Sequence, residues 1–260
     1  MKKANLVKGM IQDIFFFDRA PLKEVSFGFR LLLHTLKERG SMRLLIVICL
    51  LLTVSFPANA DIEARIARVV DGDTIHAITK DGERIKVRFV GIDTPEHRYR
   101  RHWQEPWATM ATKHLGRLLP PGSEVLIKTA SPPLDHYGRV LGMVFNRGVN
   151  INLAMVEDGY AFPYLVHPVM DMEEEFSAAF VRARGAGKGI HNPANPLKEP
   201  PGIFRLRVSG RAPYWWVGNL KTRRYLPPEG IEVYPVEYRV FFENESRARI
   251  AGYRKDDKNS

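Results

Sequence analysis

Acidic and basic side chains gather around two turn signals between residues 71 and 96. The first is Asp71-Gly72-Asp73-Thr74, and the second, Asp93-Thr94-Pro95-Glu96, follows an alternating segment that carries Arg88. Carboxylates at strand ends suit a hard cation, which prefers oxygen ligands. An arginine aimed at the same place suits a phosphate, because its planar guanidinium pairs with two oxygens. These residue types together indicate metal-assisted phosphodiester cleavage.

Each of these side chains also has an ordinary structural interpretation. Asp73 and Asp93 could hold calcium at one rim of a barrel, or they could be two turn-forming aspartates. Glu96 could be a general base for a water beside the metal, or a plain loop carboxylate. Arg88 and Arg139 could bind phosphate, or they could be solvated surface cations. Spacing alone leaves both interpretations open.

A basic loop and two tyrosines could add substrate contacts. The loop from His97 to His102 could clamp phosphates or simply be solvated. Its histidines lack partners at metal-ligand spacing. Tyr137 and Tyr164 could stack on nucleobases, or they could be core or half-buried tyrosines.

Hydrophobic periodicity predicts five short strands and an intervening helix. In the third strand, Ile85, Val87 and Phe89 face one way while the arginines and lysine between them face the other. The helix is expected to begin at Pro106, since proline is tolerated in a first turn. The strands are expected over residues 62–70, 74–79, 83–92, 124–129 and 139–145.

Two later helices complete the pattern. A short one is expected to be capped by Asn150 or Asn152 and closed by Gly159. A longer one is expected to be capped by Asp171, with Glu174 three residues on. The buried face of the longer helix is predicted to be Phe176, Phe180 and Ala183.

Five strands with helices packed outside fit a small closed barrel. The predicted fold class is α+β, mainly β: a five-stranded oligonucleotide-binding (OB-fold) barrel with three helices, followed by a small C-terminal β-rich appendage. We divide the chain into a barrel domain at 61–192, a proline-rich linker at 193–203 and the appendage at 204–260. A monomer is expected.

The net charge of the 260-residue chain is a weak argument for an anionic partner. The formal charge is +10, but residues 1–60 hold 9 of the 39 basic and 4 of the 29 acidic residues, which leaves +5 for the remainder. The mildly basic remainder is compatible with nucleic acid without requiring it. The single cysteine, Cys49, excludes a disulfide framework or a cysteine-based zinc site within one chain.

The first sixty residues contain a secretory pattern. The apolar run from Leu44 to Phe56 precedes Ala58-Asn59-Ala60, which has the small-x-small pattern of a signal-peptidase site. The run is short for a membrane span, which needs about 20 residues. We predict a signal peptide at 42–60 and export to the periplasm or medium. The alternative is an uncleaved segment that anchors the protein in a membrane. Residues 1–41 are an extension, either from a misplaced start before Met42 or a real cytoplasmic segment.

Residues from about 65 to 192 resemble the staphylococcal nuclease (thermonuclease) family. The resemblance implies an OB-fold barrel and a micrococcal-nuclease type of endonuclease. It would hydrolyse DNA and RNA with Ca²⁺ and leave 3′-phosphate ends. The matching pieces are Val70 to Thr74, Arg88 to Glu96, Asp135 to Arg139, and Ile151 to Gly159.

The resemblance also implies roles for individual residues. Asp73 and Asp93 would ligate calcium together with the Thr94 carbonyl. Glu96 would be the general base beside the attacking water. Arg88 and Arg139 would hold the phosphate and stabilise the charge that builds up in the transition state. Tyr137 would contact the nucleotide.

Two parts of the chain depart from the family pattern. The loop from His97 to Glu105 is unusually rich in arginine and tryptophan, which concerns substrate preference. Phe162-Pro163-Tyr164 aligns loosely, so no nucleotide-binding role is carried onto Tyr164. The appendage faintly resembles a small zinc-binding repeat but lacks its cysteines.

Two other classes of function remain open. One is a nucleic-acid-binding OB-fold module without turnover. The other is a membrane-tethered protein whose nuclease-like domain serves assembly.

Overall fold

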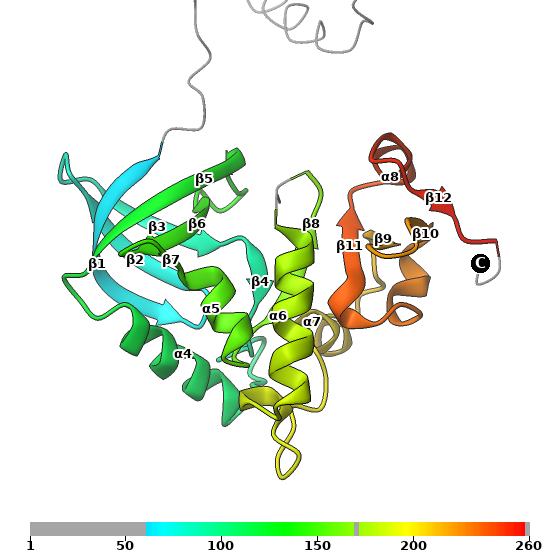
Figure 1. The fold of residues 1–260 in the computed structure, drawn as a ribbon, viewed down its shortest axis with the longest axis horizontal. Helices are drawn as coiled ribbons and strands as arrows, with labels where there is room; N and C mark the ends of the chain where they lie inside the picture. Colours follow the sequence, from blue (N-terminus) through cyan, green and yellow to red (C-terminus); the bar gives the residue numbers. More distant parts are fainter. Residues whose placement is uncertain (1–60, 169–171, 258–260) are drawn as a thin grey trace, which may run out of the picture. The chain divides into compact units, whose positions relative to one another are not determined.

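The computed structural model describes residues 61–168 and 172–257 (Figure 1). The expected extension and signal peptide at 1–60 lie outside the described residues. Within the described part, no helix combines the length and apolar character needed to cross a membrane.

The first sheet closes into the predicted five-stranded barrel. Its order is β3-β2-β1-β5-β6-β7, and β3 also pairs with β6, which joins the two sides of the sheet. The β3–β6 pairing is parallel and the other pairings in this sheet are antiparallel, so the barrel is mixed. The predicted fold class is therefore confirmed. The strands are β1 (Ile62–Asp71), β2 (Thr74–Thr79), β3 (Arg84–Phe89), β5 (Glu124–Leu134), β6 (Val140–Asn146) and the short β7 (Val149–Asn150).

The predicted strand over 83–92 is wrong in one respect, because it is broken after Phe89. Gly91 adopts φ +79, a left-handed conformation that glycine reaches at low cost. The chain then leaves the barrel sheet as β4 (Gly91–Asp93) and pairs antiparallel with β8 (Phe162–Val166). This bend places Asp93 at the end of a strand in the second sheet.

Three helices accompany the barrel, as predicted. The short helix is capped by Asn150, whose side chain accepts a hydrogen bond from the Leu153 N–H at 3.1 Å. Asn152 is not a cap but is buried. The longer helix has Met172 at its N-cap with no side-chain cap, while Asp171 lies outside the described residues. The helices are α4 (Trp107–Leu118), α5 (Ile151–Glu157) and α6 (Glu173–Gly185).

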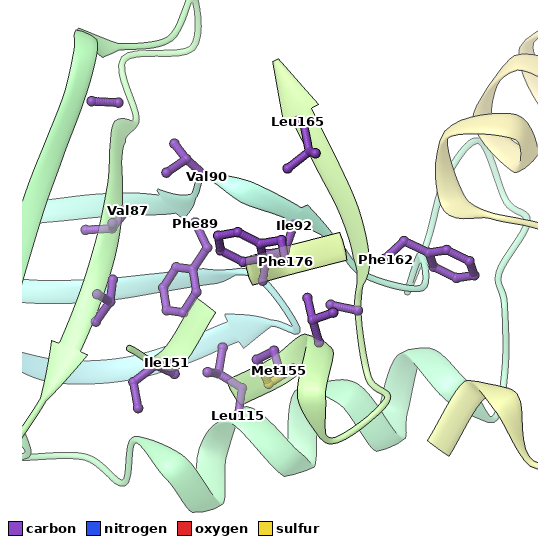
Figure 2. Close-up of a cluster of buried hydrophobic side chains, with 14 of the residues drawn as sticks. Val87, Phe89, Val90, Ile92, Leu115, Ile151, Met155, Phe162, Leu165 and Phe176 are labelled. Atoms are coloured by element: carbon purple, nitrogen blue, oxygen red, sulfur yellow. The ribbon is translucent and has the colours of Figure 1, made fainter. Parts of the chain in front are cut away.

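The hydrophobic core fills the space between the barrel and its helices (Figure 2). Phe89 from β3, Leu115 from α4 and Met155 from α5 are at most 1% exposed. The predicted face of α6 is buried against the same core. Burying one such large apolar side chain stabilises the fold by about 1.5–3 kcal/mol.

A second sheet joins the appendage to the barrel domain. Its order is β12-β10-β9-β11-β8-β4, so β8 lies between β4 and the strands of the appendage. The strand β8 was not predicted from the sequence, and it pairs in parallel with β11. The remaining strands are β9 (Trp216–Asn219), β10 (Arg224–Leu226), β11 (Arg239–Phe242) and β12 (Arg254–Lys255).

The remaining helices lie in or near the appendage. Helix α7 (Pro201–Ser209) begins within the segment expected to be a linker, and α8 (Glu245–Ile250) precedes β12. Domain boundaries at 192 and 203 stay predictions, although backbone pairing between β8 and β11 crosses them. Single 3-10 turns are η1 (Gly189–His191), η2 (Pro228–Glu232) and η3 (Val236–Tyr238).

Candidate active site

The turn between β1 and β2 lies directly against the end of β4. The Asp73 carboxylate accepts hydrogen bonds from the Thr94 N–H at 3.1 Å and from its hydroxyl at 2.8 Å. A Cβ atom on Gly72 would lie 2.8 Å from the Thr94 Cβ and 2.9 Å from the Ala111 Cβ. Only glycine allows this approach without displacing a neighbour, so Gly72 brings Asp73 to Thr94.

Arg88, at the end of β3, connects two of the predicted cation ligands. Its Nη1 lies 3.1 Å from the Asp73 carboxylate, and its Nη2 lies 3.5 Å from Asp93. The Phe89 carbonyl accepts a further hydrogen bond from Nη1 at 2.8 Å. Only 15% of the Arg88 side chain is exposed. Arg88 is therefore not a solvated surface cation.

Glu96 is fixed by a hydrogen-bonded pair with buried Gln104. The Glu96 N–H donates to the Gln104 side-chain oxygen at 3.1 Å, and the Gln104 N–H donates to the Glu96 carbonyl at 2.9 Å. The Gln104 side-chain amide in turn donates to the Glu199 carbonyl at 2.9 Å. The loop that carries Glu96 is thereby attached to the segment before α7.

Arg205 of α7 belongs to the site although the sequence analysis missed it. Its two terminal nitrogens donate to the two carboxylate oxygens of Asp93, each at 2.9 Å. One of them also donates to Glu96 at 2.5 Å. Nothing in the local sequence distinguishes Arg205 from the neighbouring Arg207, and the motif pieces end before α7.

The loop between β5 and β6 contributes Tyr137 and Arg139. Asp135 holds this loop, because its carboxylate accepts from the Tyr137 N–H at 2.9 Å and from the Arg139 Nε at 2.7 Å. The Arg139 guanidinium lies 5.4 Å from the centre of the Tyr137 ring, which is 72% exposed. Arg139 pairs with Asp135 and has no recorded ion pair with Asp73 or Asp93.

One cleft is lined by every residue to which the family resemblance assigns a role. The structure thus brings together side chains from the β1–β2 turn, from β3, from the segment after β4 and from the β5–β6 loop. The predicted residues that line the cleft are Asp73, Arg88, Asp93, Thr94, Glu96, Tyr137 and Arg139. Arg205, which was not predicted, lines the same cleft.

Burial dominates the electrostatics of two carboxylates in this cleft. It raises the pKa of Asp73 above its ordinary value, against the opposing charge of Arg88. It likewise raises the pKa of Glu96, against the opposing charge and hydrogen bond of Arg205. Burial would lower the pKa of Arg205 itself, but Asp93 and Glu96 outweigh burial and raise it, so the guanidinium stays charged.

Comparison with known proteins shows which family the chain belongs to. The family model described as "Staphylococcal nuclease homologue" matches residues 86–192. The chain is 34% identical over 154 residues to an uncharacterized endonuclease of Escherichia coli, covering 57% of this chain and 88% of that protein. The chain belongs to the staphylococcal nuclease family.

Two other nucleases are similar to parts of the chain. It is 37% identical over 206 residues to Endonuclease YhcR of Bacillus subtilis, covering 76% of this chain. The chain spans only 17% of the length of that protein. It is 31% identical over 122 residues to a micrococcal nuclease of Shigella flexneri, covering 44% of this chain and 64% of that protein.

In this member of the staphylococcal nuclease family, the oxygen atoms of Asp73, Asp93 and Thr94 are suitable ligands for a hard divalent cation. Asp73 and Asp93 are both buried, and their carboxylate oxygens are the kind of ligand that such a cation prefers. No group of three or more His, Cys, Asp or Glu side chains within 61–168 and 172–257 is arranged to hold a metal. Two carboxylates and the Thr94 carbonyl would therefore need water molecules to complete a calcium shell.

In the basic loop from His97 to His102, His97 lines the cleft, and the loop makes polar contacts through His97 and Arg100. His97 contacts Glu105, with 3.3 Å between Nδ1 and the carboxylate. Arg100 and Arg101 adopt φ of 48° and 66°, a left-handed conformation unusual for residues other than glycine. Arg100 also donates to the Ser209 carbonyl at 3.3 Å. Clamping of phosphates by this loop stays a prediction.

Proposed function

We propose that the protein is a calcium-dependent, sugar-nonspecific nuclease that hydrolyses phosphodiester bonds of DNA and RNA. The observation that carries this proposal is the single cleft in which Arg88 lies between the buried carboxylates of Asp73 and Asp93. Family membership supports the same activity. The 3′-phosphate product and the choice of calcium rest on the family resemblance.

The cation would be held by Asp73, Asp93 and the Thr94 carbonyl. When bound, calcium would neutralise negative charge on the phosphate and make its phosphorus easier to attack. No other step is assigned to the cation.

Glu96 is the proposed general base. It accepts a proton from water as the water oxygen bonds to phosphorus, and the bond from phosphorus to the 5′-oxygen breaks. The departing oxygen takes its proton from solvent, and the phosphate stays on the 3′-oxygen. Before Glu96 can accept that proton, its carboxylate must be freed from at least part of its pairing with Arg205.

The two arginines of the motif would stabilise the charge that grows on the phosphate. Arg88 reaches the cleft from the barrel, and Arg139 reaches it from the β5–β6 loop. A planar guanidinium can pair with two phosphate oxygens, so two arginines on different elements can fix the phosphate in position. Tyr137 is exposed beside Arg139 and is proposed to contact the nucleotide.

A nucleic-acid-binding module without turnover is the second candidate. The observation in its favour is that Arg205 pairs with both Asp93 and Glu96, the proposed ligand and base. A cleft closed in this way could bind a phosphate chain through its arginines without cleaving it.

We also propose that the protein is exported and acts as a monomer on nucleic acid outside the cytoplasm. Membrane contact through the apolar run of residues 44–56 is the alternative. Release of a processed form that starts at Asp61 would support export.

The test of the proposed function is a cleavage assay on single-stranded DNA, double-stranded DNA and RNA, with calcium or with a chelator. We expect cleavage of all three only with calcium. We also expect products that a polymerase extends only after phosphatase treatment. Cleavage in chelator, or directly extendable ends, would contradict the calcium or product assignment. Salt-sensitive binding without cleavage would establish the binding module instead.

A further inference from the structure

Arg205 occupies the oxygens that the proposed cation site requires. Its guanidinium takes both oxygens of Asp93 at 2.9 Å and reaches Glu96 at 2.5 Å. A forked, two-bond pairing of this kind is the strongest geometry available between an arginine and a carboxylate. Asp93 is 4% exposed and Arg205 is 28% exposed, so solvent weakens the pair little.

Helix α7 is fixed in the position that delivers Arg205. The Trp107 indole N–H donates to the Asn195 carbonyl at 3.1 Å, and Gln104 donates to the Glu199 carbonyl at 2.9 Å. Both bonds tie the segment before α7 to the loop and helix that follow Glu96. A Cβ added to Gly202 would lie 3.7 Å from the Asp93 carboxylate, so the first turn of α7 passes close to it.

The charges of the cleft make Arg205 and a divalent cation alternatives at Asp93. Three carboxylates, those of Asp73, Asp93 and Glu96, face the guanidinium groups of Arg88 and Arg205, so two of the three negative charges are balanced without a cation. A cation bound to Asp93 would need oxygens that Arg205 holds. It would also bring a like charge next to that guanidinium in a largely buried place, which is unfavourable.

We propose that Arg205 is a positioning residue that holds Asp93 and Glu96 in the absence of a cation and sets the calcium affinity by competing for Asp93. The proposal rests on the cation site of the proposed function. The Arg205 side chain would have to leave the Asp93 oxygens before calcium could bind there, and that movement would also free Glu96. The appendage therefore contributes to the barrel's active site through one side chain of α7.

The chain offers a matched control on the same helix. Arg207 lies two residues further along α7 and pairs with Glu199, away from the cleft carboxylates. Replacing it removes an arginine of the same helix without touching Asp93 or Glu96. Arg205→Lys is a second test variant, because lysine keeps the charge but offers a single point donor instead of a fork.

The experiment is calcium titration by calorimetry on the full chain without nucleic acid, for the unmodified protein, Arg205→Ala, Arg205→Lys and Arg207→Ala. We expect Arg205→Ala to bind calcium about tenfold more tightly or better, Arg205→Lys to lie in between, and Arg207→Ala to match the unmodified protein. Circular dichroism checks that each variant is folded, and Arg205→Lys carries the test if Arg205→Ala is not.

Two results would overturn the proposal, and they differ in whether the proposed function also fails. Calcium binding of equal or lower affinity in the folded Arg205 variants would show that Arg205 does not compete with the cation, and would leave the proposed function standing. Calcium binding in none of the proteins would remove the cation site itself, and with it both this inference and the calcium dependence of the proposed function.

Discussion

Thr94 donates two hydrogen bonds to Asp73, one from its N–H at 3.1 Å and one from its hydroxyl at 2.8 Å. The two residues are 21 positions apart in the chain. These bonds attach the β1–β2 turn to the end of β4, so two of the proposed cation ligands are placed by one contact. Burial and ion pairing within the cleft then determine the pKa values of the Asp73 and Glu96 carboxyl groups.

Gly72 should be essential to this contact. Gly72→Ala introduces a Cβ 2.8 Å from Thr94 and 2.9 Å from Ala111, so the turn must shift. We expect a loss of about 1–3 kcal/mol in the free energy of unfolding, measured by urea denaturation. Gly116→Ala is the control, because no atom lies within 4 Å of the added Cβ in helix α4. It should stabilise by up to about 1 kcal/mol. Equal effects of the two substitutions would contradict the close approach at Gly72.

Asn152 should hold the barrel together at the point where β3 ends. Its fully buried side chain accepts from the Val144 N–H at 2.9 Å and donates to the carbonyls of Val90 and Gly142 at 2.8 and 3.2 Å. Asn152→Ala removes all three bonds and should cost about 3 kcal/mol in urea denaturation.

The neighbouring Asn150 provides the control for that substitution. Asn150→Ala removes a helix cap and two weak contacts from its side-chain amide to the sulfur atoms of Met143 and Met172, and it should cost about 1 kcal/mol. Equal losses of stability in the two variants would contradict the claim that the three hydrogen bonds of Asn152 stabilise the barrel more than the Asn150 cap does.

The stability of the cation-free protein should depend on pH through Asp73. Burial raises the pKa of this carboxyl in the folded state above its ordinary value, despite the opposing charge of Arg88. The folded state thus holds the proton more tightly than the unfolded chain. The stability that Asp73 contributes is complete below the unfolded pKa and is lost as pH rises through the folded pKa.

Comparison with Asp73→Asn isolates this effect, because asparagine does not titrate. In chelator, the free energy of unfolding of the unmodified protein minus that of the variant should fall as pH rises above the ordinary aspartate pKa of about 4. A difference that rises over this range would show that the folded-state pKa is lowered instead.

Local patterns in the sequence were sufficient for the barrel strands, whereas the choice of site residues came from the family resemblance. Alternation fixes which side of β3 faces the core, and short intervals place Arg88, Asp93 and Glu96 at one end of it. The break at Gly91 was missed, because an alternating run gives no sign of a change of sheet until the pairing partner is known.

What was missed depends on contacts between distant parts of the chain. Arg205 and Asp93 are 112 positions apart, and no periodicity relates them. The strand β8 contains Pro163, which argues against a strand in the sequence. Its role is visible only from its pairing with β4 and β11. The bonds of Asn152 likewise require three segments to be in place.

The most direct test of the central claim is the single-turnover rate of DNA cleavage by Glu96→Gln in saturating calcium, with Glu105→Gln as the control. Glu105 lies on the same loop but pairs with His97 and Thr109. Loss of a general base should lower the rate by about 10²–10⁴-fold, while the control should stay within about threefold of the unmodified protein. A Glu96→Gln protein that is folded and cleaves within a few-fold of the unmodified rate would contradict the assignment of Glu96 as the base.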